Sequence, residues 1–214
     1  MSGPNFKSFE SWVFRWESTP TMWFILVQDD GVPVLRLREG KSEASERNFQ
    51  SMTAVERKSF VMGQASHIEN FKISEVICAP SIKCIVAADS FINGFQRDKK
   101  GEIKGLNVKI DGGLSFTAEC YYLHKEFRSL VVERGYDVDE TYESSVEGPT
   151  KCKEDPYVDL DSRLSAALKF MRKKYSDSED GVVAVFVDES LESALRNAAR
   201  RKRLQVKLHV PAVE

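Results

Sequence analysis

Basic side chains in the last third of the chain form the pattern with the clearest chemical meaning. Arg196, Arg200 and Arg203 stand at positions i, i+4 and i+7 of a predicted helix, so they share one side of it. Guanidinium groups fixed in this way suit phosphate oxygens, and the pattern predicts contact with the phosphate backbone of a nucleic acid. Further basic residues extend this predicted surface on the same helix, the following strand and the preceding helix: Arg201, Lys202, Lys207, Lys169, Arg172 and Lys173.

A charged helix face also has a simpler explanation. Cations near the carboxyl end of a helix are favoured by its dipole and are commonly solvated. Residues 161–214 carry eleven basic and eight acidic side chains, whereas residues 136–160 carry eight acidic side chains and two lysines. An acidic protein, or the acidic segment of this chain itself, is therefore an alternative partner for the basic surface.

Groups suited to catalysis or metal binding are sparse. The chain has no glycine-rich phosphate loop, GxSxG motif or HExxH motif. The four cysteines predict buried, reduced thiols, because their spacings are looser than those of structural zinc sites. Asp188, Asp89 and Asp29 each follow a predicted strand, and their convergence would build a Mg²⁺ site for a phosphoesterase or nuclease. We expect no cofactor, and the sequence favours a protein without enzymatic activity.

Overall charge and hydrophobicity indicate an ordinary globular protein. The 214 residues include 31 basic and 33 acidic side chains, so any attraction to a polyanion must come from a local patch. No apolar run approaches the roughly 18 residues that a membrane span requires, and we expect no membrane partner. Few cysteines and the absence of a signal-peptide pattern predict a cytoplasmic or nuclear protein.

Hydrophobic periodicity predicts the elements of the first two-thirds of the chain. Residues 23–38 and 105–122 are typical of β-hairpins around Asp-Gly turns, and residues 72–78 and 81–88 are predicted strands. A second turn is predicted at Asn93-Gly94. Thr53 and Glu56 fit a capping box ahead of a helix over 54–65, and another helix is predicted over 125–134. Gly135 is expected to end that helix.

The last third of the chain predicts a regular alternation of helix and strand. A helix is expected from Asp161, followed by a continuously apolar strand over 182–187 that should be covered on both faces. A second helix and a strand over 204–210 complete the pattern, and the order strand, helix, strand favours a parallel crossover.

The combined prediction is an α+β fold, with antiparallel hairpins in the N-terminal two-thirds and a C-terminal αβαβ unit. Its parts are a mainly antiparallel region over 1–135, an acidic linker or loop over 136–160, and the αβαβ unit over 161–214, in a separate or the same domain. The predicted function is non-catalytic nucleic-acid binding, RNA binding included. The alternatives are a protein–protein interaction or assembly module, forming a homo-oligomer, and a metal-dependent phosphoesterase or nuclease.

Overall fold

A single six-stranded sheet organises the part of the chain that the structure describes. This computed structural model describes residues 11–15, 21–27, 52–96, 105–116, 124–146, 156–175, 181–201 and 205–209. The strands follow the spatial order β4-β3-β5-β2-β1-β6. β2, β3, β4 and β5 are parallel to their neighbours among these four, whereas β1 runs antiparallel to β2 and β6. The strand bounds are Ser11–Arg15 (β1), Thr21–Val27 (β2), Ile73–Cys78 (β3), Val108–Ile110 (β4), Val182–Asp188 (β5) and Gln205–His209 (β6).

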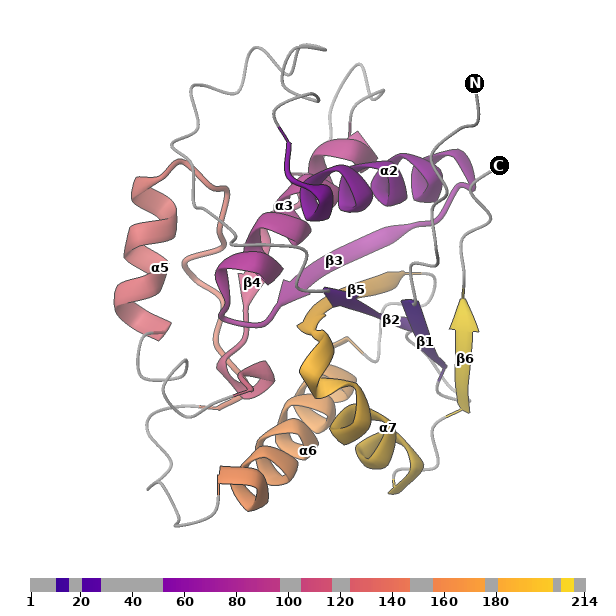
Figure 1. The fold of residues 1–214 in the computed structure, drawn as a ribbon, viewed down its shortest axis with the longest axis vertical. Helices are drawn as coiled ribbons and strands as arrows, with labels where there is room; N and C mark the ends of the chain where they lie inside the picture. Colours follow the sequence, from indigo (N-terminus) through magenta and orange to yellow (C-terminus); the bar gives the residue numbers. More distant parts are fainter. Residues whose placement is uncertain are drawn as a thin grey trace.

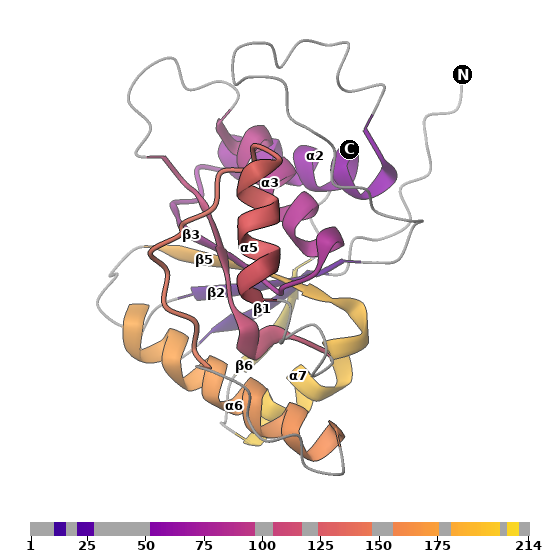
Figure 2. The ribbon, with the colours of Figure 1, turned by 90° about the vertical axis from the view of Figure 1, so that its left-hand side faces the viewer.

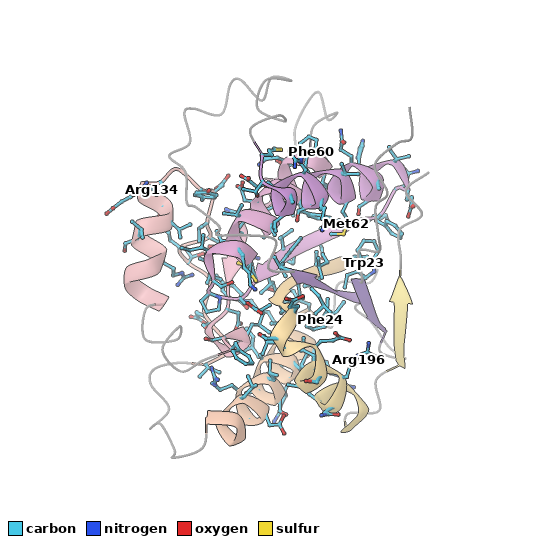
Figure 3. All side chains as sticks on the ribbon, viewed as in Figure 1. Trp23, Phe24, Phe60, Met62, Arg134 and Arg196 are labelled. Carbon is cyan, nitrogen blue, oxygen red and sulfur yellow. The ribbon has the colours of Figure 1, made fainter. Side chains whose placement is uncertain are left out.

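Helices cover both faces of the sheet. α2 and α3 lie on one face, α6 and α7 lie on the other, and α5 stands beyond the β4 edge (Figures 1 and 2). Figure 3 shows neighbouring side chains of β2 directed to opposite faces, with Trp23 toward α2 and Phe24 toward α6 and α7. The helix bounds are Ala54–Ile68 (α2), Ile82–Gln96 (α3), His124–Glu133 (α5), Pro156–Tyr175 (α6) and Glu192–Arg201 (α7), with 3₁₀ turns at Gly112–Leu114 (η1) and Glu189–Leu191 (η2).

The apolar strand β5 lies at the centre of the parallel part of the sheet. Its residues from Val182 to Val187 are all buried, which confirms the prediction of a strand covered on both faces. Phe186 packs against Phe91 of α3, with ring centroids 5.4 Å apart. One cluster of buried side chains includes residues of α3, α6 and α7, so the core continues through the sheet from one helical layer to the other.

Two glycines allow α2 and α3 to approach closely. A Cβ atom added to Gly63 would lie 2.1 Å from the carbonyl oxygen of Phe91, and one added to Gly94 would lie 2.0 Å from that of Phe60. The predicted turn at Asn93-Gly94 is therefore wrong, because both residues lie inside α3. Gly94 serves close helix packing here and does not reverse the chain.

The predicted fold class of antiparallel hairpins is wrong, because the structure has an α/β fold with four mutually parallel strands. β2 pairs in parallel with β5, and β4 pairs in parallel with β3. The residues Asp111-Gly112-Gly113 lead into η1 where a hairpin turn was predicted. Residues 28–38 and 117–122, which would complete the hairpins, lie outside the described residues. An alternating pattern identifies a strand but does not say which strand pairs with it.

The predicted strand over 81–88 is also wrong, since residues 82–88 form the first turns of α3. Nearly every residue from Cys84 to Phe95 is buried between α2 and the sheet, so the segment shows no polar face. A short apolar run does not distinguish a buried strand from a buried helix. By contrast, the strand predicted over 72–78 is confirmed as β3.

Local capping signals predicted helix ends well. The Thr53 hydroxyl accepts from the Glu56 N–H at 3.3 Å, and the Glu56 carboxylate accepts from the Thr53 N–H at 2.6 Å, which confirms the capping box of α2. Gly135 has a φ of 82° just after α5, as expected for a helix stop. α6, however, begins at Pro156, so Asp161 lies within the helix and is not its N-cap.

The acidic segment is partly packed against the sheet. Val138 forms a parallel bridge with Val108 of β4, and Tyr136 and Tyr142 are buried. The division of the chain at residues 136–160 stays a prediction.

Among the described helices, none combines the length and apolar character that crossing a bilayer requires.

Candidate functional site

The carboxyl ends of three adjacent parallel strands bring several polar groups to one edge of the sheet. Register aligns Cys78 of β3 with Ile110 of β4 and with Phe186 of β5, so β3, β4 and β5 end close together. We call the ends of these strands and the residues that directly follow them the carboxyl edge. From β3 the chain passes through α3 to β4, at one edge of the sheet. From β5 it passes through α7 to β6, at the opposite edge. Open parallel sheets bind ligands where the connections diverge in this way.

A half-buried ion pair spans the gap between β3 and β5 at this edge. The Lys83 ammonium lies 2.7 Å from the Asp188 carboxylate, and their side chains are 12% and 20% exposed. Lys83 belongs to the first turn of α3, where the Ser81 hydroxyl accepts from the Cys84 N–H at 3.4 Å. Asp188 ends β5. The pair therefore joins the start of α3 to the end of β5, at the point where the connections diverge.

The Asp188 carboxylate is held in its ionised form. Its Oδ1 accepts from the backbone N–H of Ser190 at 3.1 Å and from the Ser190 hydroxyl at 2.6 Å. Partial burial opposes ionisation, but the hydrogen bonds from Lys83 and Ser190 and the charge of Lys83 outweigh it, so the pKa of Asp188 lies below its usual value. The edge thus offers an anion and a cation side by side at neutral pH.

Two thiols lie beneath the ion pair. Cys78 and Cys84 form no disulfide and are fully buried. Burial raises the pKa of Cys84 to about 12, and burial followed by the neighbouring groups Cys84 and Asp111 raises the pKa of Cys78 well above its usual value. Both thiols are therefore neutral and poor nucleophiles at physiological pH, as expected of cysteines that serve as small apolar side chains.

A buried carboxylate organises the loop after β4. Asp111 is fully buried and accepts from the Gly113 N–H at 2.8 Å, the Tyr142 hydroxyl at 2.7 Å, the Ser145 N–H at 3.1 Å and the Ser145 hydroxyl at 2.6 Å. Its own N–H donates to the carbonyl of Cys78 at 2.9 Å. Burial and then the Asp111 charge raise the pKa of Tyr142. The network connects the segment over 136–146 with the carboxyl edge.

A second lysine in a similar setting lies one residue before the end of β4, and its side chain pairs with other acids than Asp188. Lys109 of β4 forms an ion pair with Glu75 of β3 and lies 4.0 Å from the carboxylate of Asp139. Its side chain is 15% exposed, close to the value for Lys83. The likeness of the two lysines makes Lys109 a useful reference position.

The predicted convergence of aspartates on a metal ion is not found in the described part of the chain. Asp188 lies at the carboxyl edge, but Asp89 lies within α3, where its carboxylate accepts from the Asn93 amide at 3.2 Å. Asp29 lies outside the described residues. No group of three or more potential metal ligands occurs among the residues described.

The basic residues of the predicted nucleic-acid surface lie on two elements of one sheet face and on β6. Lys169, Arg172 and Lys173 are exposed on α6. Arg196 of α7 donates to Glu192 from Nε at 2.7 Å and lies 2.5 Å from it through a second nitrogen, as an i, i+4 pair. Arg200 and Arg201 belong to α7 and Lys207 to β6, but their side chains lie outside the described part, as do Lys202 and Arg203 entirely; the predicted site stays a prediction.

Sequence reasoning missed Lys83 and Asp111. Lys83 lay in a segment interpreted as a strand, and Asp111 was interpreted as a turn residue. Ser81 gave a signal that could have placed Lys83 in a helix, because serine is a favoured N-cap residue and is typical of a helix start. Asp188 was identified correctly as a carboxylate that ends a buried strand.

Comparisons with known proteins give little further information. No protein-family model and no curated protein matches the chain. Among solved structures, the chain resembles the ecdysone phosphate phosphatase of Bombix mori, solved in complex with tungstate, with 18% sequence identity and a TM-score of 0.49. The match covers 69% of this chain, which spans about half of the phosphatase, 55% of its length. A likeness at this level does not assign the activity of the phosphatase to this chain.

The prediction of non-catalytic nucleic-acid binding, RNA binding included, is corrected by these findings. The solved structure that the chain resembles is that of a phosphatase, and it gives no support to RNA binding. In the described part of the chain, Glu192 also neutralises the guanidinium of Arg196, on which the predicted surface depended. Among the polar groups that the structure does bring together, the Lys83–Asp188 ion pair lies at the carboxyl edge.

Proposed function

We propose that the chain binds a small phosphate ester at the carboxyl edge, between the ends of β3 and β5. The observation that carries this proposal is the Lys83–Asp188 ion pair at the point where the strand connections diverge. The geometry of this edge alone supports the proposal, and the likeness to the phosphatase adds nothing to it. The full burial of Cys78 and Cys84 favours binding over any reaction that uses a cysteine nucleophile.

The chemistry of the edge suits a phosphate group. Lys83 is a compact cation in the first turn of the 15-residue helix α3, where the helix dipole adds partial positive charge. The side chains of Lys83 and Asp188 are partly exposed, so a ligand can reach both without unfolding of the core. In this proposal, the phosphate approaches Lys83 and the remainder of the ligand approaches the loop at Asp188.

Replacing Lys83 tests the proposal directly. Thermal unfolding and calorimetric titration would be measured with glycerol 3-phosphate and glucose 6-phosphate on the unmodified protein, Lys83→Met and Lys109→Met. Lys109→Met is the matched control, because it also removes a half-buried lysine from an ion pair on a neighbouring strand. A ligand at a hundred times its dissociation constant stabilises by about 2.7 kcal/mol, which thermal unfolding detects readily.

We expect at least one ester to stabilise the unmodified protein and Lys109→Met, with the effect lost in Lys83→Met. Stabilisation that survives in Lys83→Met would refute the proposed site. No stabilisation of the unmodified protein by either ester would refute the proposed ligand class.

We also infer a cytoplasmic or nuclear location, because four cysteines among 214 residues are too few for a disulfide framework. A protein partner or a homo-oligomer stays a further proposal. Sedimentation at several protein concentrations would test self-association.

A further inference from the structure

We infer that Asp188 determines specificity at this edge, selecting phosphate esters that carry hydrogen-bond donors over sulfate, which carries none. This inference rests on the proposed function, since it requires that a phosphate approaches Lys83. It assigns to Asp188 a role in recognition beyond its place as the cap of η2.

The geometry makes Asp188 a competitor of any anion that approaches Lys83. Its Oδ2 lies 2.7 Å from the Lys83 nitrogen, so a phosphate oxygen at hydrogen-bond distance from that nitrogen would lie within a few ångströms of the carboxylate. Two anions this close repel each other, and the repulsion is strong in a half-buried site. Sulfate, which has no proton to donate at neutral pH, therefore gains the attraction of Lys83 and suffers the repulsion of Asp188.

A ligand with hydroxyl groups compensates for this repulsion. A carboxylate has capacity for about four hydrogen bonds and acts only as an acceptor, so a hydroxyl beside the phosphate can donate to Asp188. The Ser190 N–H and hydroxyl hold Oδ1, which fixes the direction in which Oδ2 points. The edge is thereby complementary to a phosphate and a neighbouring hydroxyl on one small molecule, such as a polyol phosphate.

The test compares two probes, sulfate and glycerol 3-phosphate, by calorimetric titration of the unmodified protein and Asp188→Asn. Asparagine keeps the size of the side chain and an oxygen that can accept from Ser190, and it is itself a good capping residue. Asp188→Ser, with another capping residue, gives a second variant in case the first is poorly folded. Circular dichroism and thermal unfolding would show which variants are native.

We expect Asp188→Asn to bind sulfate about tenfold more tightly than the unmodified protein does, because the repelling charge is gone. Binding of glycerol 3-phosphate should stay the same or weaken, so the preference for the ester falls about tenfold or more. An unchanged preference in folded Asp188→Asn and Asp188→Ser would overturn the inference while leaving the proposed function intact. Failure of both probes to bind the unmodified protein and both variants would overturn the two proposals together.

Discussion

Asp111→Asn tests whether the buried carboxylate network fixes the loop that follows β4. Each carboxylate oxygen accepts from a backbone N–H, Oδ1 from Gly113 at 2.8 Å and Oδ2 from Ser145 at 3.1 Å. Asparagine replaces one of these oxygens with an NH₂ group, which donates and cannot accept. In either orientation of the amide, its NH₂ group would therefore face a backbone N–H that is unable to turn away. Asparagine therefore fits the space that Asp111 occupies, but it cannot accept from both backbone N–H groups.

The cost follows from the groups that lose their partners. A hydrogen bond to a charged acceptor contributes about 1.5–3 kcal/mol, and a buried donor left without an acceptor costs about 1–3 kcal/mol. The two effects overlap at one N–H, so we expect Asp111→Asn to lower the free energy of unfolding by about 3–4 kcal/mol. Domains of this kind are stable by about 5–15 kcal/mol, so the loss is a large fraction of the whole.

Urea unfolding followed by circular dichroism measures this free energy. Tyr142→Phe removes only the hydroxyl that donates to Asp111 at 2.7 Å, and it should cost about 1–2 kcal/mol. Glu140→Gln, at an exposed acid of the same segment, should stay within about 0.5 kcal/mol of the unmodified protein. A loss below about 1 kcal/mol for Asp111→Asn would refute the reasoning, because the network would then hold no buried donor in place.

Two further predictions concern packing and thiol chemistry. Gly63→Ala should destabilise by about 2 kcal/mol or more in thermal or urea unfolding, because a clash with the backbone carbonyl of Phe91 costs about 3 kcal/mol or more and alanine in a helix gains only about 1 kcal/mol. Gly105→Ala, where a Cβ meets nothing within 4 Å, should change stability little, and a stabilised Gly63→Ala would contradict the close approach. At pH 8, Cys84 should react with iodoacetamide about a thousandfold more slowly than an ordinary thiol, because burial raises its pKa to about 12. Peptide mass spectrometry measures the rate, and equal rates in native and urea-unfolded protein would show that the thiol is exposed.

Local signals predicted those elements whose stability depends on nearby residues. The capping box of Thr53 and Glu56 and the stop at Gly135 involve groups three to five residues apart, and both are found as expected. The burial of β5 was also predictable, because six consecutive apolar residues have no side suited to solvent. In these cases all the residues that determine the element are close together in the sequence.

The site could not be predicted in the same way, because its partners are distant in sequence. Lys83 meets Asp188 only because β5 inserts next to β3, and no local pattern indicates that neighbour. Asp111 needs Tyr142 and Ser145, which come from a segment whose acidic composition suggested a solvated loop. The basic face of α7 led to a prediction that the structure does not support, although its charges are regularly spaced in sequence. A neighbouring acid on the same helix, Glu192, pairs with one of them, Arg196.

The position of β5 in the sheet also determines when the sheet can be completed during synthesis of the chain. β5 lies between β2 and β3 although both are synthesised long before it. Until residues 182–188 leave the ribosome, the sides of β2 and β3 that face each other across this gap lack the strand that will join them. Strand edges exposed in this way invite pairing with other chains, so the nascent protein is expected to need chaperone protection until its last third emerges.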